Sequence, residues 1–159
     1  MSEKSEKSGK SEKYDVIVAG GGPSGLAAAV SAARVGARTA VLEKNGVLGG
    51  NLTSGHVGPI MGSTDKGTMT EEICDLLNIG KRFLMHDVEW AKMILPKWVS
   101  DAGVDVFLQT QVADAIMEGN RIRGLTVAGK NGLEEIYGDV VVDATGDGLA
   151  AYCAGAEYE

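Results

Sequence analysis

Hydrophobic positions in the first part of the chain change from a strand-like run to a helical period and back again. Val16–Ala19 is a short, apolar, largely β-branched run, typical of a buried strand. A glycine-rich turn follows, and the apolar side chains of Ser24–Val35 then share one helical face until Gly36 ends the helix. Thr39–Leu42 is a second apolar run. The pattern predicts a strand, a helix and a strand joined as a right-handed βαβ unit.

The middle of the chain carries two further helical patterns. Thr70–Leu77 is one predicted helix, and Asp87–Ala102 is a stronger one whose apolar positions share a face. Asp87 can cap the second helix, and Pro96 should bend it because proline has no backbone N–H to donate. Val104–Leu108 then predicts a third buried strand.

Beyond this strand the hydrophobic period changes to two. Three short alternating segments are separated by Gly-Asn and Asn-Gly pairs, which are hairpin signals. We expect a three-stranded antiparallel meander, then a Val-rich strand at Asp139–Ala144 and a short helix at Leu149–Ala154. The predicted meander strands are Val112–Met117, Arg121–Val127 and Glu134–Tyr137. The expected fold class is therefore α/β: a Rossmann-like parallel sheet with helices on one face and the antiparallel meander on the other.

The chain divides into a short polar segment and one domain. Met1–Lys13 contains only Ser, Glu, Lys and Gly after the first residue. Such a segment has no apolar surface to offset its ordering entropy, so we expect a disordered tail or leader. Residues 14–159 are enough for one domain with one hydrophobic core.

Composition narrows the classes of function. A formal net charge of −7 argues against nucleic acid as a partner, because phosphate binding needs a basic face. No apolar run approaches the ~18 residues that a membrane span requires. Cys74 and Cys153 have neither a CxxC partner nor a histidine at metal-ligand spacing, so we expect free thiols and no metal site. Together these features predict a cytoplasmic protein.

The glycine-rich turn carries the first candidate chemistry. It contains G-x-G-x-x-G between a predicted strand and a predicted helix, the context in which this motif binds dinucleotides. The first glycine permits the tight turn, the second lets the backbone approach a pyrophosphate, and the third lets the helix pack against the strand. The helix N-terminus then offers N–H groups and a positive dipole end to the phosphates. The turn consists of Gly20, Gly21, Gly22, Pro23, Ser24 and Gly25.

A carboxylate lies where this motif requires one. Glu43 follows the second strand, about 20 residues after the glycines, and could accept hydrogen bonds from both hydroxyls of an adenosine ribose. It would repel a 2′-phosphate, which disfavours NADP despite the neighbouring Lys44. These residues predict an adenine dinucleotide site.

Two later features favour FAD over NAD: the Gly49-Gly50 doublet and the sequence Ala144-Thr145-Gly146 at the end of the Val-rich strand. With them the chain resembles the FAD-dependent oxidoreductases of the glutathione-reductase-like superfamily, particularly a bacterial family of them. The resemblance covers nearly everything from Tyr14 to Tyr158. It is strongest in YDVIVAGGGPSGLAAAVSAARVGARTAVLEKNGVLGGNLTSG, around Ala91–Leu108, and in VVVDATGDGLAA.

The resemblance implies FAD as the cofactor and a role for each matching residue. The three motif glycines would contact the pyrophosphate, and Glu43 would contact the ribose. Gly49-Gly50 would contact the backbone of the dinucleotide near the ribityl chain, and Val112 would contact the adenine. Thr145 and Gly146 would support the cofactor from the end of the next strand. It also implies a longer parent with a substrate domain, of which this chain is the N-terminal FAD-binding part. The partner of that parent would be a small-molecule redox substrate. No catalytic acid, base or nucleophile is identified, although His56 lies on a loop that could approach the flavin, and His86 is interpreted as structural.

Three alternatives stay open. One is an NAD-dependent dehydrogenase, and another is a thiazole-synthase-like enzyme, which shares the glycine turn and acidic residue but consumes its dinucleotide as a reactant. The third is a non-catalytic nucleotide-binding fragment. Neither the substrate nor the oligomeric state follows from the sequence.

Overall fold

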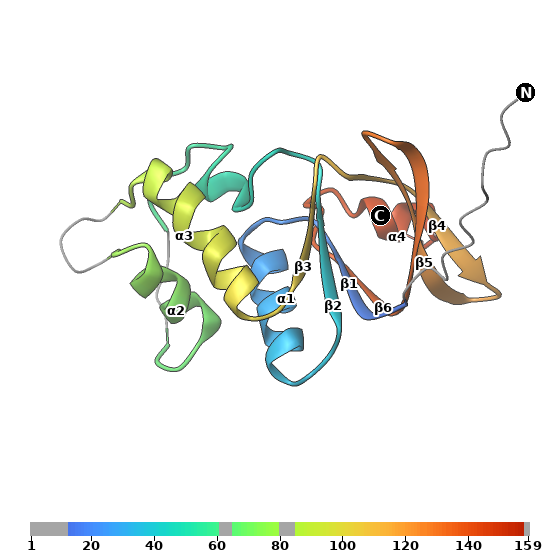
Figure 1. Ribbon diagram of the computed structural model, residues 1–159, viewed down its shortest axis with the longest axis horizontal. Helices are drawn as coiled ribbons and strands as arrows, with labels where there is room; N and C mark the ends of the chain where they lie inside the picture. The colour runs from blue at the N-terminus through green and yellow to red at the C-terminus, as the bar shows by residue number, and fades with distance from the viewer. Residues whose placement is uncertain (1–12, 61–64, 80–84, 158–159) are drawn as a thin grey trace, which may run out of the picture.

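The computed structural model describes residues 13–60, 65–79 and 85–157, so most of the predicted tail, Met1–Lys13, lies outside the described residues. The described strands form a six-stranded sheet in the order β3-β2-β1-β6-β5-β4 (Figure 1). The strands are β1 (Tyr14–Ala19), β2 (Thr39–Glu43), β3 (Asp105–Leu108), β4 (Gln111–Glu118), β5 (Arg121–Gly129) and β6 (Gly132–Asp143). The helices are α1 (Pro23–Arg34), the 3-10 turn η1 (Gly50–Leu52), α2 (Met69–Leu76), α3 (Val88–Asp101) and α4 (Leu149–Cys153).

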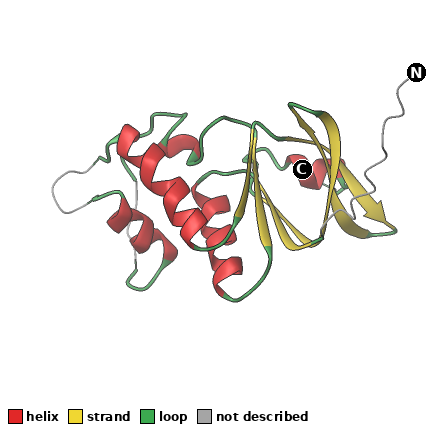
Figure 2. Cartoon of the chain, viewed as in Figure 1, coloured by secondary structure: helices red, strands yellow, loops and turns green. Residues whose placement is uncertain are grey.

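The parallel half of the sheet is covered by helices on one face. β1 pairs in parallel with β2 and β6, and β2 pairs in parallel with β3. Helices α1, α2 and α3 lie together on one side of these strands (Figure 2). Val18 and Val41 from the strands are fully buried against Leu26, Val30 and Leu95 of α1 and α3. This arrangement is the predicted βαβ unit extended by a second crossover.

The antiparallel meander packs over the opposite face. β4 pairs with β5, and β5 with β6, in antiparallel register. Leu125 and Val127 from the meander share a second core with Ile17 and Leu42 from the parallel strands. The short helix α4 contributes the buried Ala150 to the same core. The predicted fold class, with helices on one face and the meander on the other, is confirmed.

One strand replaces two predicted ones. Glu134–Tyr137 and Asp139–Ala144 were expected to be separate strands, but β6 runs unbroken through both. Its first half pairs with β5, and its second half, from Gly138 onward, pairs with β1. A Cβ at Gly138 would stand 2.8 Å from the side chain of Ile17. Gly138 therefore is not a break; it lets the strand pass β1 closely as it changes partners.

Helices α2 and α3 both have side-chain N-caps, of which Asp87 on α3 is the predicted one. The Asp87 carboxylate accepts from the backbone N–H groups of Glu89 and Trp90, at 2.8 and 3.1 Å, and so caps α3. Pro96 lies inside α3, as predicted. Thr68 caps α2 by accepting from the N–H of Glu71 at 3.2 Å. Both helices begin one residue away from the expected start.

Helix α2 is tied to its neighbours by one carboxylate. Glu72 accepts two hydrogen bonds from the Arg34 guanidinium, at 2.7 and 2.6 Å, and one from the Trp98 indole at 2.7 Å. The hydrogen bond from Arg34 is the largest cause of a lowered pKa for Glu72, which burial opposes and the Trp98 bond reinforces. Three helices therefore meet at one charged group.

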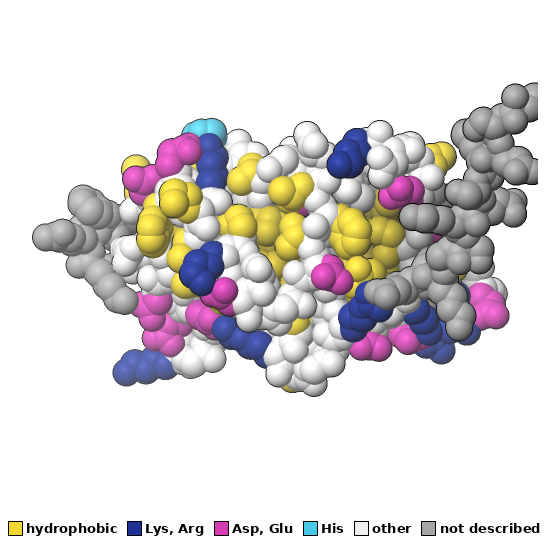
Figure 3. Space-filling model, viewed as in Figure 1, with side chains coloured by type: hydrophobic (Ala, Val, Ile, Leu, Met, Phe, Trp, Pro, Cys, Tyr) yellow, Lys and Arg dark blue, Asp and Glu magenta, His cyan; other side chains and the backbone are white. Residues whose placement is uncertain are grey.

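The visible surface mixes charge and apolar area. Charged groups of both signs flank a band of hydrophobic side chains in Figure 3. Helix α3 and strand β3, which lie toward the viewer in Figure 1, include the exposed hydrophobic residues Met93 and Leu108. Within the described part of the chain, no helix is both long enough and apolar enough to cross a bilayer.

Candidate functional site

The carboxyl ends of the parallel strands surround one cavity of about 600 Å³. β1 leads into Gly20, β2 ends at Glu43, and β6 leads into Ala144, all of which line it. Because β2 and β6 lie on opposite sides of β1, the chain diverges here, which is where open α/β sheets bind ligands. The lining residues are Gly20, Gly22, Pro23, Ser24, Leu42, Glu43, Lys44, Asn45, Gly50, Asn51, Ser54, Gly55, Thr110, Gln111, Val112, Ala144, Thr145, Gly146, Asp147 and Leu149.

The three motif glycines differ in what surrounds them. Gly20 has φ +107°, and a Cβ there would stand 2.2 Å from the carbonyl oxygen of Ala144. A Cβ at Gly25 would stand 1.9 Å from the carbonyl oxygen of Gly20, so the start of α1 packs directly on the turn. At Gly22 a Cβ would meet nothing within 4 Å. Two glycines are therefore required by the protein's own packing, whereas the third leaves open space at the cavity.

The N-terminus of α1 faces this open space without a protein cap. Gly22 is the N-cap residue and provides no side-chain hydrogen bond, and Pro23 is the first residue of the helix. The first turn of α1 contains no acidic residue. Its N–H groups and positive dipole end thus suit an anion in the cavity.

Glu43 is a buried carboxylate tied to the glycine turn. Only 4% of the residue is exposed. Its Oε2 accepts from the N–H of Gly21 at 2.8 Å, and its Oε1 accepts from the backbone and side-chain N–H groups of Asn45, both at 2.7 Å. These contacts fix the carboxylate beside the cavity, with acceptor capacity left on Oε2.

The Gly49-Gly50 segment packs against the glycine turn. The N–H of Gly49 donates to the carbonyl of Gly21 at 2.7 Å, and a Cβ at Gly50 would stand 2.9 Å from the Cα of Gly22. The hydroxyl of Thr53 donates to the carbonyl of Leu48 at 2.6 Å and closes the segment on itself. Two segments distant in sequence thus form one wall.

Asp143 organises the wall at the end of β6. Its carboxylate accepts from the N–H and hydroxyl of Thr145, at 3.0 and 2.7 Å, and from the N–H of Ala151 at 2.9 Å. Burial would raise the pKa of Asp143, but these hydrogen bonds together lower it. The Thr145 hydroxyl also accepts from the N–H of Leu149 at 3.0 Å. Asp143 therefore holds the loop in place as an anion.

The structure brings together most of the predicted site residues. Gly25 and Gly49 do not line the cavity and instead pack behind it. Sequence reasoning missed Asn45, Asn51 and Asp143, because loop polar residues follow no period that would reveal them. The predicted residues on the lining are Gly20, Gly22, Pro23, Ser24, Glu43, Lys44, Gly50, Val112, Thr145 and Gly146.

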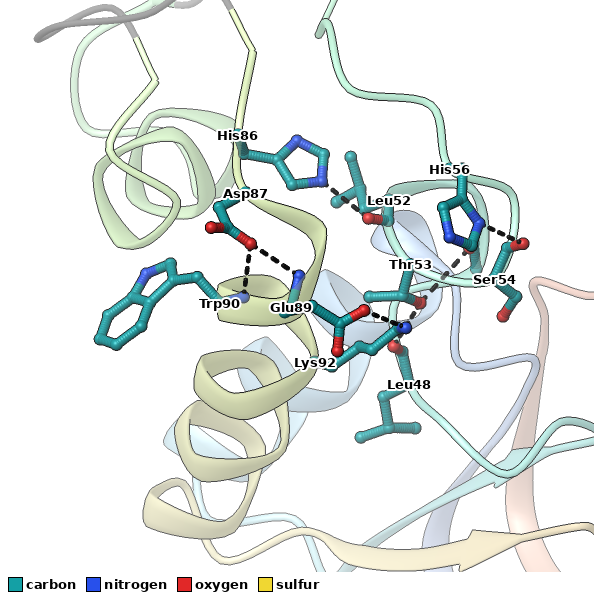
Figure 4. A network of polar contacts seen from close by, with 11 residues as sticks. Leu48, Leu52, Thr53, Ser54, His56, His86, Asp87, Glu89, Trp90 and Lys92 are labelled. Carbon is teal, nitrogen blue, oxygen red and sulfur yellow. Dashed lines mark hydrogen bonds and ion pairs between the residues drawn. The ribbon is translucent and has the colours of Figure 1, made fainter.

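Two histidines lie next to this region (Figure 4). His56 is exposed, has φ +52°, and its Nδ1 lies 3.2 Å from the carbonyl of Ser54. His86 is buried, with its two ring nitrogens against carbonyl oxygens. Neither lines the cavity. Among the described residues, no group of three or more His, Cys, Asp or Glu side chains could hold a metal ion.

Comparison with known proteins defines the class. Residues 15–159 match the family described as FAD dependent oxidoreductase, and the chain belongs to that family. The prediction of a FAD-dependent oxidoreductase domain with FAD as cofactor is thereby confirmed at the level of the family. The cavity fits that cofactor, since it joins an uncapped helix N-terminus to a buried carboxylate.

Individual relatives have different activities. The chain is 32% identical to the thiamine thiazole synthase of Pyrococcus abyssi over 124 residues, which cover 72% of this chain and 47% of the relative. It is 28% identical to the soluble pyridine nucleotide transhydrogenase of Hahella chejuensis, over 84% of this chain and 31% of the relative. The chain thus spans less than half the length of these relatives.

Solved structures agree on the fold. THI4 of Thermovibrio ammonificans superposes with a TM-score of 0.67 at 25% identity, covering 89% of this chain and 61% of that one. A geranylgeranyl bacteriochlorophyll reductase-like protein from Thermoplasma acidophilum also gives 0.67, at 21% identity, over 92% of this chain and 43% of that one. The second likeness supports the fold alone.

Proposed function

We propose that the cavity binds FAD, with the ADP half of the cofactor lying across the glycine turn and Glu43. The observation that carries this proposal is the 2.8 Å hydrogen bond from the N–H of Gly21 to Glu43 Oε2. It holds a carboxylate that can accept from ribose hydroxyls next to the glycine turn, where backbone N–H groups can donate to a diphosphate.

Six of the predicted residues that line the cavity have a part in this proposal. The open face of Gly22 and the first turn of α1 receive the diphosphate, and Glu43 accepts from the ribose hydroxyls. Val112 lies beside the adenine. The lining contributed by Gly50, together with Thr145 and Gly146, then supports the remainder of the cofactor.

The isoalloxazine ring supplies hydride or electron transfer when FAD is bound. This chain's own residues bind and orient the cofactor. Glu43, being anionic and buried, disfavours a 2′-phosphate and so favours FAD over NADP. We further assign the chain to the glutathione-reductase-like superfamily, acting in the cytoplasm on a small-molecule redox substrate.

A second candidate is a thiazole-synthase-like use of the same site. It is favoured by the 32% identity to a thiamine thiazole synthase and the superposition on THI4. Both candidates require an adenosine diphosphate moiety at the glycine turn, and they differ in whether the dinucleotide is a cofactor or a reactant.

The absorbance spectrum of the purified protein, followed by mass spectrometry of the molecule released on heating, tests the proposal. We expect a flavin spectrum, or its appearance on adding FAD, and its displacement by excess ADP. A protein that binds neither FAD nor ADP would contradict the proposal, and a released non-flavin adenine dinucleotide would favour the second candidate.

A further inference from the structure

We propose that His86 is a positioning residue that clasps the cavity loop 50–58 and strengthens nucleotide binding. The inference rests on the proposed function, because it concerns the affinity of the same cavity. His86 itself does not line the cavity and would act through the loop.

The clasp consists of two short hydrogen bonds. His86 Nε2 lies 2.7 Å from the carbonyl oxygen of Leu52, and Nδ1 lies 2.7 Å from the carbonyl oxygen of Gly58. Figure 4 shows the ring pointing from the segment before α3 toward Leu52. The residue is only 7% exposed, so water is a poor substitute for either contact.

Both partners are carbonyl oxygens, which only accept hydrogen bonds. A ring nitrogen that carries a proton donates to the carbonyl that faces it. The ring therefore joins Leu52 and Gly58, two positions of the loop that are separated in sequence, to the segment before α3.

The clasped loop is a wall of the cavity. Asn51 and Ser54, on either side of Leu52, line the cavity, as does Gly55. Within the loop, the N–H of Gly55 donates to the carbonyl of Gly50, and the N–H of Val57 donates to that of Asn51. Fixing the Leu52 carbonyl thus fixes the segment that faces the ligand.

The surrounding charges come from two elements. On the loop, His56 is exposed and contacts Ser54. On the other side, Asp87 is engaged in capping α3, and Glu89 forms an ion pair with Lys92 at 2.6 Å.

The test compares ADP-ribose affinity between the wild type and variants of His86. ADP-ribose suits the test because it carries the adenosine diphosphate moiety that the proposed function places in this cavity. Equal affinities of the wild type and His86→Asn would contradict the proposal.

Three variants isolate the clasp. In His86→Gln the amide nitrogen can replace Nε2 and donate to the carbonyl of Leu52, so affinity should stay near the wild-type value. In His86→Asn the amide reaches only the Nδ1 position, so affinity should fall about tenfold, the equivalent of one net hydrogen bond. His56→Asn is the matched control and should keep the wild-type affinity.

Amide hydrogen exchange gives a readout that does not need the ligand. After correction for intrinsic rates, the N–H groups of Thr53, Gly55 and Val57 should be protected in the wild type and in His86→Gln and should lose protection in His86→Asn. Unchanged protection would overturn the clasp. Absence of any ADP-ribose binding by the wild type would instead contradict the proposed function, with the exchange data still deciding the clasp.

Discussion

Glycines occupy two regions of this molecule for different physical reasons. In the glycine turn beside the cavity, Gly20 and Gly25 stand where a Cβ would meet backbone atoms at 2.2 and 1.9 Å. At the tips of the meander hairpins, Gly119 and Gly132 have nothing within 4 Å of a Cβ, and only their φ values of +59° and +103° disfavour other residues. The cavity glycines are therefore required by packing, and the hairpin glycines by local conformation.

Gly22 belongs to neither group, and the open space around it is the feature most informative about function. Its φ is −74°, and a Cβ there would meet no atom within 4 Å. The protein's own structure thus gives little reason for glycine at this position. A ligand whose diphosphate lies close to the backbone would give that reason.

The largest expected effect is that of Gly25→Ala. The added Cβ would overlap the carbonyl of Gly20, so α1 must move away from the turn. We expect the free energy of unfolding to fall by about 3 kcal/mol and nucleotide binding to be lost with it. Urea unfolding followed by circular dichroism measures the first effect, and an unchanged midpoint would contradict the close packing.

Gly22→Ala should separate binding from stability. The N-cap change should cost less than about 1 kcal/mol of stability, while the methyl group projects toward the diphosphate and weakens ADP binding about tenfold or more. Gly46→Ala is the matched control, because a Cβ at Gly46 also meets nothing within 4 Å and Gly46 does not line the cavity. Calorimetric titration with equal ADP affinities for the two variants would remove Gly22 from the site.

Gly132→Ala should show the reverse behaviour. Its positive φ should cost about 1 kcal/mol of stability, since alanine is strained there, without any steric clash. ADP affinity should stay unchanged because the hairpin tip does not line the cavity. A change in affinity measured on the folded variant would show that the two regions are coupled.

The smallest effect concerns Asp143 and pH. Because its pKa is lowered in the folded protein, its stabilising contribution is complete above the unfolded pKa of about 3.9 and is lost as the pH falls through the folded value. The stability difference between the wild type and Asp143→Asn should therefore be larger at pH 7 than at pH 3. Thermal unfolding at both pH values measures it, and a constant difference would show that the charge of Asp143 is unimportant.

The sequence predicted the elements that have a hydrophobic period and the turns and cap that bound them. The βαβ unit, the Asp87 cap of α3 and the hairpin turns each have a local signal, and each lies within a few residues of the expected position. The continuity of β6 could not be predicted, since it depends on Gly138 passing Ile17, more than a hundred residues away in sequence. From the residue pattern alone, Gly138 is interpreted as a break between two strands.

The candidate site was likewise predictable only where a sequence motif marks it. The glycine turn and Glu43 have a fixed spacing and were found. Asn45 and Asp143 were missed, because they bond to the site residues rather than follow a motif. His86 was interpreted as structural from its position before a helix, and no sequence pattern could show that the carbonyls of Leu52 and Gly58 would meet its ring.

The central claim is that Glu43 accepts the ribose of an adenosine diphosphate in this cavity. The most direct test is a calorimetric cycle that titrates ADP and 2′-deoxy-ADP into the wild type and into Glu43→Gln. The wild type should prefer ADP by about tenfold or more, the equivalent of one charged hydrogen bond, and Glu43→Gln should reduce this preference to about threefold or less. The same preference in both proteins would contradict the claim, because the ribose 2′-hydroxyl would then bind elsewhere.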